Sequence, residues 1–187
     1  MFKKIVLTLS LVAVLGLTGC SKTNTGDEGT KVEANENVDY EAQLNEIHTA
    51  VKEAYGENYL ANMPLDSEIL ESVYGVSSDL YDAVVADGAS MSVHVDTFIA
   101  IHPTQGNEQA VYDALNAYRD TQVNDAMQYP SNVPKLQASV VTQKGGYVFY
   151  IALGTTDEFY EDEAEAIAVY EELNKIALDA IDSVLNK

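Results

Sequence analysis

The segment LQASVVTQKGGYVFYIAL, residues 136–153, contains the strongest indication of the fold. Residues 136–142 and 147–153 are rich in β-branched and aromatic side chains, which favour strands. Gly145 and Gly146 lie between these two runs, and glycine tolerates the positive φ angles that a tight turn requires. The segment therefore predicts an antiparallel β-hairpin.

Another strand is indicated by residues 91–101, MSVHVDTFIAI, in which polar and apolar side chains tend to alternate. Successive side chains point to opposite faces of a strand, so the odd-numbered residues would share one face. His94, Asp96 and Phe98 would lie on the other face. If helices cover only the first face, these three side chains point outward.

Apolar residues recur at the spacing of an amphipathic helix in several other segments. We expect a first helix between Asp39 as its N-cap and Gly56 as its stop signal. A long last helix is expected after Thr155 and Glu158, which have the spacing of a capping box. Shorter helices are expected over residues 66–74, 80–85 and 111–118. The second of these also fits a strand, but we favour the helix.

Together these elements predict an α+β fold with a small antiparallel or mixed sheet of three to four strands. Helices are expected on one face of the sheet, in a partial ferredoxin-like arrangement that includes the long C-terminal helix. A strand-helix-strand connection within such a sheet is expected to be right-handed.

The first twenty residues have the organisation of a secretory signal. Lys3 and Lys4 precede the apolar residues 5–17, a run too short and wrongly flanked for a membrane-spanning helix. The following LTGC sequence, which ends at Cys20, resembles a bacterial lipobox. This resemblance implies cleavage before Cys20 and attachment of a diacylglyceryl group to its thiol, so that the protein is anchored in membrane lipid.

We therefore expect three parts in the chain. Residues 1–19 are the expected signal peptide, and residues 20–38 are the expected lipidated cysteine and flexible tether, since they contain few apolar side chains. Residues 39–187 are expected to form a single globular α+β domain on the outer, extracytoplasmic face of the cell membrane. Because lipid would occupy the only cysteine, no disulfide is expected within the chain.

The chain is strongly acidic, with 30 Asp and Glu residues against 10 Lys and Arg residues and a formal net charge of −20. Nucleic-acid binding depends on neutralisation of phosphates by cationic side chains, so no nucleic-acid partner is expected. The same shortage of cationic side chains argues against a basic patch that binds anionic lipid headgroups.

A further resemblance covers about residues 44–154. The sequences MSVHVDTFI (91–99), AYRD (117–120), QYP (128–130) and GGYV (145–148) are similar to domain of unknown function family 4358. That family occurs mainly on lipoproteins of Gram-positive bacteria. The resemblance implies no established activity, substrate or catalytic residue.

His94 and Asp96 are the main candidates for chemistry, because they stand at positions i and i+2 of the expected strand. A carboxylate at this spacing can orient or charge an imidazole, and the pair can hold a metal if a third ligand is present. His102 would be that ligand only if the strand bends. The alternative is a polar, solvated sheet face; we favour it and expect no metal or cofactor.

Other candidate residues also have two interpretations. Arg119, the only arginine, can bind an anionic ligand bidentately or form a structural salt bridge. Phe98 and Tyr150 can form an outward aromatic patch or contribute to the core. The acidic residues 157–165 are expected to be a solvated helix face and not a calcium loop. Ser92 lies near His94 without the motif of a nucleophilic enzyme, so no catalytic residue is assigned.

We therefore expect a lipid-anchored extracytoplasmic lipoprotein whose domain binds a ligand or an envelope protein, peptide or glycan and is not an enzyme. Its candidate ligand-binding residues are His94, Asp96, Phe98 and Arg119. The alternatives are a small envelope enzyme or metal-dependent protein centred on His94 and Asp96, and a purely structural spacer.

Overall fold

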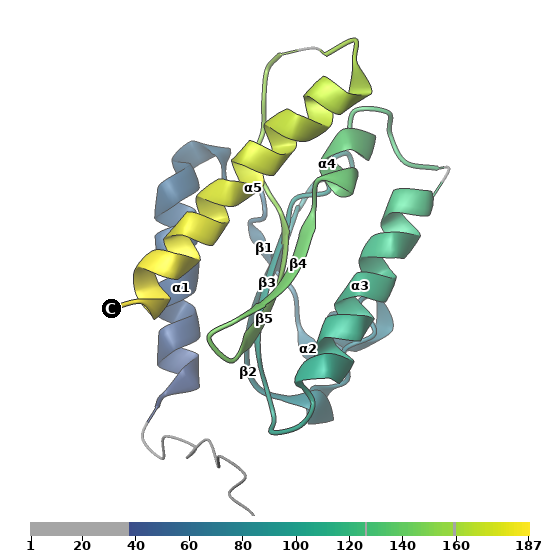
Figure 1. Ribbon diagram of the computed structural model, residues 1–187. Helices are drawn as coiled ribbons and strands as arrows, with labels where there is room; N and C mark the ends of the chain where they lie inside the picture. The colour runs from purple at the N-terminus through teal and green to yellow at the C-terminus, as the bar shows by residue number, and fades with distance from the viewer. Residues whose placement is uncertain (1–37, 126, 159) are drawn as a thin grey trace, which may run out of the picture. The chain divides into compact units, whose positions relative to one another are not determined.

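The computed structural model describes residues 38–187 except residues 126 and 159. The described residues include a five-stranded antiparallel sheet with the strand order β1-β2-β3-β5-β4 (Figure 1). The expected α+β class is confirmed. The expected signal peptide and all of the expected tether except its last residue lie outside the described residues.

The helices are α1 (Tyr40–Tyr55), α2 (Ser67–Ser72), α3 (Glu108–Asn124), α4 (Val133–Gln137) and α5 (Glu163–Leu185). The strands are β1 (Met63–Pro64), β2 (Tyr81–Gly88), β3 (Thr97–Pro103), β4 (Val140–Lys144) and β5 (Tyr147–Ala152). Two short 3₁₀ helices are η1 (Gly56–Asn58) and η2 (Ser78–Leu80). In the part of the chain that the structure describes, no helix combines the length and apolar character needed to cross a membrane.

The predicted hairpin is formed by β4 and β5. Lys144 pairs with Tyr147 across the turn, where Gly145 and Gly146 have φ angles of 61° and 88°. β5 pairs with β3 on its other side, so β3 and β4 run parallel to each other with β5 between them. Since α3 connects β3 to β4, these elements form a split β-α-β unit, which is the ferredoxin-like part of the fold.

Helices cover both faces of the sheet, and the prediction of helices on one face only was wrong. Figure 1 shows α1 and α5 on one side of the sheet and α2 and α3 on the other. The core on the first face includes Leu44 and Ile181, and the core on the second face includes Leu70 and Leu115. All six residues of β5 are buried, because each face of this strand contacts a helical layer.

Two strands, β1 and β2, were not predicted, so the expected sheet of three to four strands was too small. Residues 80–85, for which we favoured a helix, lie mostly in β2. Val84 packs on one side of the sheet and Val85 on the other, so both positions are apolar and the alternation typical of a half-exposed strand is absent. β1 has only two residues, which is too short for a detectable pattern.

β3 begins at Thr97, although the sequence predicted a strand from residue 91. Its neighbour β2 ends at Gly88, which pairs with Thr97, so residues 91–96 have no strand beside them. The chain turns here, and the His94 N–H donates to the Met91 carbonyl at 3.0 Å.

The ends of the long helices are set by capping aspartates. The Asp39 carboxylate accepts a backbone N–H of the first turn of α1 at 2.9 Å, as predicted. The N-cap of α5 is Asp162, whose Oδ1 accepts two backbone N–H groups at 2.8 and 3.2 Å. The long C-terminal helix is confirmed, but it starts later than the Thr155 capping box predicted, because Asp162 satisfies the backbone donors of its first turn.

Candidate functional site

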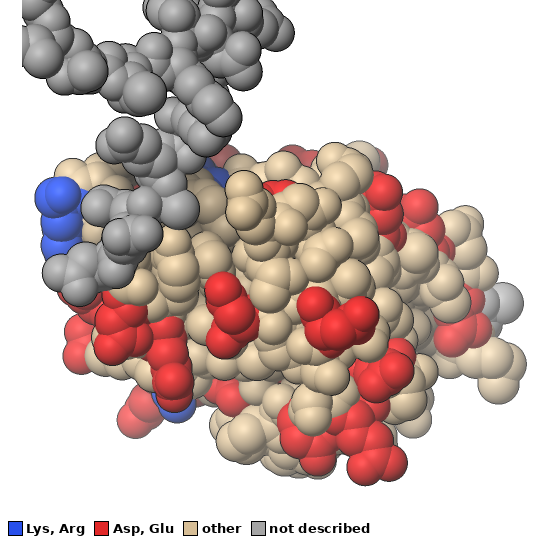
Figure 2. All heavy atoms as spheres, turned by 90° about the horizontal axis from the view of Figure 1, so that it is seen from below, with Lys and Arg blue, Asp and Glu red and all other residues tan. Residues whose placement is uncertain are grey.

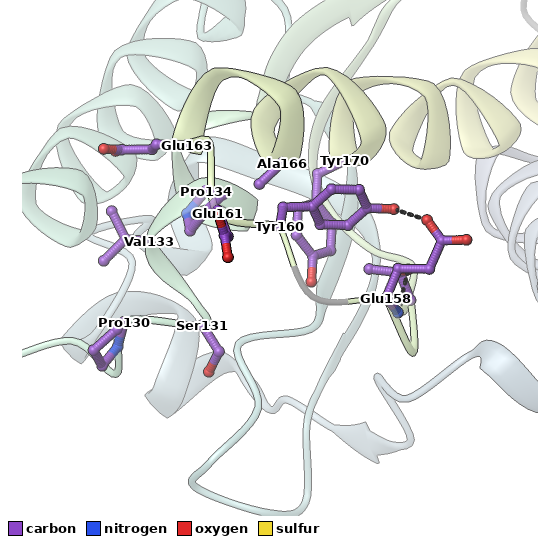
Figure 3. Close-up of a pocket in the computed structure, with 11 residues that line it drawn as sticks. Pro130, Ser131, Val133, Pro134, Glu158, Tyr160, Glu161, Glu163, Ala166 and Tyr170 are labelled. Carbon is purple, nitrogen blue, oxygen red and sulfur yellow. Dashed lines mark hydrogen bonds between the residues drawn. The ribbon is translucent and has the colours of Figure 1, made fainter.

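A pocket of about 730 Å³ lies where α4 meets the N-terminal half of α5 (Figure 3). One wall comes from Pro130 and Ser131 in the loop before α4 and from the first turn of α4. The other wall comes from residues in the segment 156–163 and from Ala166 and Tyr170 on α5. Pockets of this size accommodate small molecules or a short stretch of peptide.

The pocket combines apolar walls, two aromatic rings and three carboxylates. Figure 3 shows the hydroxyl of Tyr170 and the carboxylate of Glu161 directed toward the open centre. The Tyr160 hydroxyl donates to Glu158 Oε2 at 2.7 Å, which holds this ring and carboxylate together. Glu163 accepts a hydrogen bond at 2.9 Å from the amide of the last residue of α4 and so joins the two walls. The charged groups among the described lining residues are all acidic.

Behind the pocket lies a buried ion pair between Asp96 and Lys135. Lys135 Nζ is 2.6 Å from Asp96 Oδ1, and the two side chains are 6% and 0% exposed. The same ammonium lies 5.8 Å from the centre of the Tyr170 ring. Burial raises the pKa of Asp96 and lowers the pKa of Lys135, and their mutual attraction opposes both shifts without cancelling them. Apart from this ion pair, the Asp96 carboxylate has no hydrogen-bond donor among the described residues.

The structure separates the predicted pair of His94 and Asp96 into two environments. His94 lies in the loop before β3 and is partly exposed, whereas Asp96 is completely buried against Lys135. The charge of His94 favours the ionised form of Asp96, but less strongly than Lys135 does. The prediction that both side chains point outward from one strand face was wrong, because residues 91–96 do not form a strand. No group of three or more His, Cys, Asp and Glu residues that could hold a metal is present among the described residues.

Phe98 and Tyr150 are buried, as in the favoured of their two interpretations, and form no outward patch. Phe98 is buried beneath α1 and stacks on His48, with ring centres 5.9 Å apart and planes 6° apart. Tyr150 is buried on the opposite face, where Tyr118 of α3 contacts it edge-on. Both aromatic residues therefore belong to the core, because helices cover both sides of the sheet.

Arg119 binds the end of a helix. Its Nη2 donates to the carbonyl of Gln137 at 2.7 Å, and its Nε donates to the carbonyl of Ser139 at 2.8 Å. These residues are at and just beyond the C-terminus of α4, where carbonyl groups lack partners within the helix. The guanidinium thus connects α3 to α4 and positions one wall of the pocket; its nearest carboxylate, Asp120, is 3.8 Å away.

Two histidine-aspartate pairs were missed in the sequence because their members come from different elements. His48 Nε2 on α1 lies 2.7 Å from Asp87 Oδ2 on β2. His102 Nδ1 on β3 lies 2.5 Å from Asp82 Oδ1 on β2. Only a correct assignment of β2 would have indicated the second pair, since its residues lie near each other across the two strands.

The pocket itself was also missed. Residues 157–165 were interpreted as a solvated helix face, but helix α5 starts only at residue 163. The preceding residues turn toward α4 and supply Glu158, Tyr160 and Glu161. The mixture of Tyr and Glu in this segment was the only available signal, and it has no characteristic spacing.

Comparison with known families gives one match. The family described as Domain of unknown function (DUF4358) matches residues 54–153, and the chain belongs to this family. The match includes the whole sheet and helices α2 to α4, while α5 lies beyond it. Neither the curated proteins nor the solved structures yielded a match to the chain.

Proposed function

We propose that this chain is a lipid-anchored extracytoplasmic lipoprotein, and that its domain binds a ligand or protein partner in the pocket between α4 and α5 without catalysing a reaction. The N-terminal sequence supports the anchor, because a basic start, an apolar run and a terminal LTGC sequence are the features of lipoprotein precursors. The pocket supports the binding role, because it combines apolar walls with a few convergent polar groups.

The observation that carries the proposal is the position of the pocket relative to the start of α1. The ring of Tyr40, the first residue of α1, stacks on His102 near the end of β3. Figure 1 shows α4 near the opposite end of the domain from the start of α1. The pocket lies at this α4 end, where the Lys135 ammonium pairs with Asp96, the residue just before β3. A chain anchored at Cys20 would enter the domain at Tyr40 and would therefore present the pocket at the far end.

The charge distribution supports the same orientation. Figure 2 views the domain from the end at which α1 begins, and this face has many acidic side chains and few basic ones. Acidic side chains are repelled by anionic lipid headgroups, so this end would not adhere to the membrane. A tether of about 18 residues reaches at most about 60 Å, which is enough to hold the domain away from the bilayer.

The buried environment of Asp96 does not favour the alternative of an enzyme or metal-dependent protein centred on His94 and Asp96. A catalytic or metal-binding carboxylate must reach its substrate or metal, and this one is fully buried beside an ammonium group.

The anchor is tested by fractionating cells that produce the wild type or Cys20→Ser. We expect the wild type in the membrane fraction with a lipid-modified N-terminus, and the variant outside that fraction. Retention of Cys20→Ser in the membrane would contradict a lipid anchor at this residue.

The binding role is tested by photo-crosslinking in intact cells. A photoreactive residue at Ser131, on the pocket wall, should form a discrete adduct, whereas the same residue at exposed Ser72 on α2 should not. Equal labelling from both positions, or none from Ser131, would refute binding in this pocket.

A further inference from the structure

The charge of the pocket indicates the kind of ligand that it accepts. Glu158, Glu161 and Glu163 line it, and no Lys, Arg or His is found among its described lining residues. A concave surface with charges of one sign concentrates counterions of the opposite sign. A ligand that fills this pocket removes water from the carboxylates, and a cationic group compensates best for that loss.

The rings of Tyr160 and Tyr170 in the pocket also favour a cationic group. The face of an aromatic ring attracts ammonium and guanidinium groups. The protein already makes this contact within its own structure, because the Lys135 ammonium lies 5.8 Å from the centre of the Tyr170 ring. Pro130 and Pro134 add apolar surface against which the methylene groups of a Lys or Arg side chain can pack.

An anionic ligand would find no cationic side chain among the described lining residues. The N-terminus of α5 lies beside the pocket and would otherwise attract an anion. Its first backbone N–H groups are already bonded to Asp162, and Glu163 and Glu165 add negative charge to the first turn. The nearby ammonium of Lys135 is paired with Asp96.

The surroundings of the pocket favour a peptide over a small amine. Met91 and Val93 are 56% and 46% exposed, and Met127 and Tyr129 are 87% and 56% exposed. The two loops that carry them meet where the Asn132 amide donates to the Val93 carbonyl at 3.0 Å. Exposed apolar side chains beside a pocket are typical of protein-binding surfaces, and methionine adapts to varied partners.

We infer that the pocket binds a basic peptide segment, with a Lys or Arg side chain beside Glu161 and the tyrosine rings and with apolar neighbours on the exposed loops (Figure 3). This inference rests on the proposed binding role of the same pocket. It adds the chemical class of the partner.

The test uses two pentapeptides, acetyl-Leu-Pro-Arg-Pro-Leu-amide and the same peptide with citrulline in place of arginine. Citrulline has nearly the same shape as arginine but no charge. Titration calorimetry with the full chain in detergent should show at least tenfold tighter binding of the arginine peptide, and this preference should shrink as salt is added.

Variants identify the site of binding. Glu161→Gln and Tyr160→Leu should each weaken binding of the arginine peptide about threefold to tenfold and leave the citrulline peptide nearly unchanged, since each removes one interaction with the cation. Glu68→Gln on α2 makes the same charge change at an exposed position outside the pocket and should have no effect.

Equal affinity for the two peptides, or no binding of either one, would overturn the inference. If the two peptides bind with equal affinity and Tyr160→Leu abolishes the binding of both, the pocket is still a binding site, but one that selects apolar segments. A crosslink from Ser131 without peptide binding would likewise preserve the proposed function and refute only the basic partner.

Discussion

Replacement of Lys135 by methionine should destabilise the domain strongly, because it leaves a buried carboxylate without its counterion. At the observed separation of 2.6 Å between Lys135 Nζ and Asp96 Oδ1, Coulomb's law with an effective dielectric constant of about 20 gives an attraction of about 6 kcal/mol. Removal of each charge from water costs several kcal/mol, so the intact pair contributes little net stability. The pKa directions agree, since burial is the largest cause of both shifts.

Loss of only one partner has a different effect. For Lys135→Met we expect the free energy of unfolding to fall by about 3–5 kcal/mol, the usual cost of leaving a buried charge unpaired. Domains of this size are stable by only about 5–15 kcal/mol, so this is a large share of the total. The double variant Asp96→Leu with Lys135→Met should return to within about 1 kcal/mol of the wild type, or exceed it, because it removes both desolvation costs.

Urea unfolding followed by circular dichroism measures these differences. The matched control is Lys187→Met, which breaks an exposed ion pair with Glu46 and should cost less than about 1 kcal/mol.

The pH dependence of stability is a second test, since a carboxyl with a raised pKa in the folded state binds protons more tightly there than in the unfolded chain. The deficit of Lys135→Met should therefore shrink as the pH falls toward about 4.

A loss below about 1 kcal/mol in Lys135→Met would refute this reasoning, since it would mean that water or another group already compensates Asp96. A double variant as unstable as Lys135→Met would also refute this reasoning, because the loss of stability would then come from the packing of the lysine stem and not from the unpaired charge of Asp96.

Three further results are expected. Asn174→Leu should lower the free energy of unfolding by about 2–4 kcal/mol in urea titrations, because the Asn174 amide satisfies one buried backbone group beyond β5 and another beyond α4; a loss near zero would show that water replaces it. Gly154→Ala should cost about 2–4 kcal/mol, since the glycine has a φ of +94° and an added Cβ would lie 2.7 Å from the Leu173 Cβ; unchanged thermal unfolding would contradict this. Burial raises the pKa of Tyr147 to about 12, so the folded state retains a proton that the unfolded state loses above about pH 10. Stability should therefore decline as the pH rises from about 10 toward 12, and this decline should be smaller in Tyr147→Phe; the same decline in both proteins would refute it.

Elements with a local signal were predictable from the sequence. The hairpin depends on two adjacent glycines between β-rich runs, and α1 depends on Asp39 and a regular apolar stripe. β2 was not predictable in the same way, because Val84 and Val85 pack on opposite faces of a sheet that is covered on both sides. That second helical layer also explains why Phe98 is buried.

The candidate site was less accessible to sequence reasoning than the fold. Asp96 was selected for its spacing from His94, whereas its actual partner, Lys135, is distant in sequence and belongs to α4. The pocket likewise combines residues near 130 with residues near 160. Only the packing of α4 against α5 brings these segments together, and no local pattern encodes that contact.

The boundary of the family match passes between the two walls of the pocket. Residues 130–134 fall inside the match, and residues 156–170 fall after it. Under the proposed binding role, substitutions in the segment before α5 and in its first turns would alter the preference for a partner and leave the matched sheet and α4 unchanged. Chimeras that exchange this C-terminal portion between family members should exchange preference for partners without disturbing the common framework.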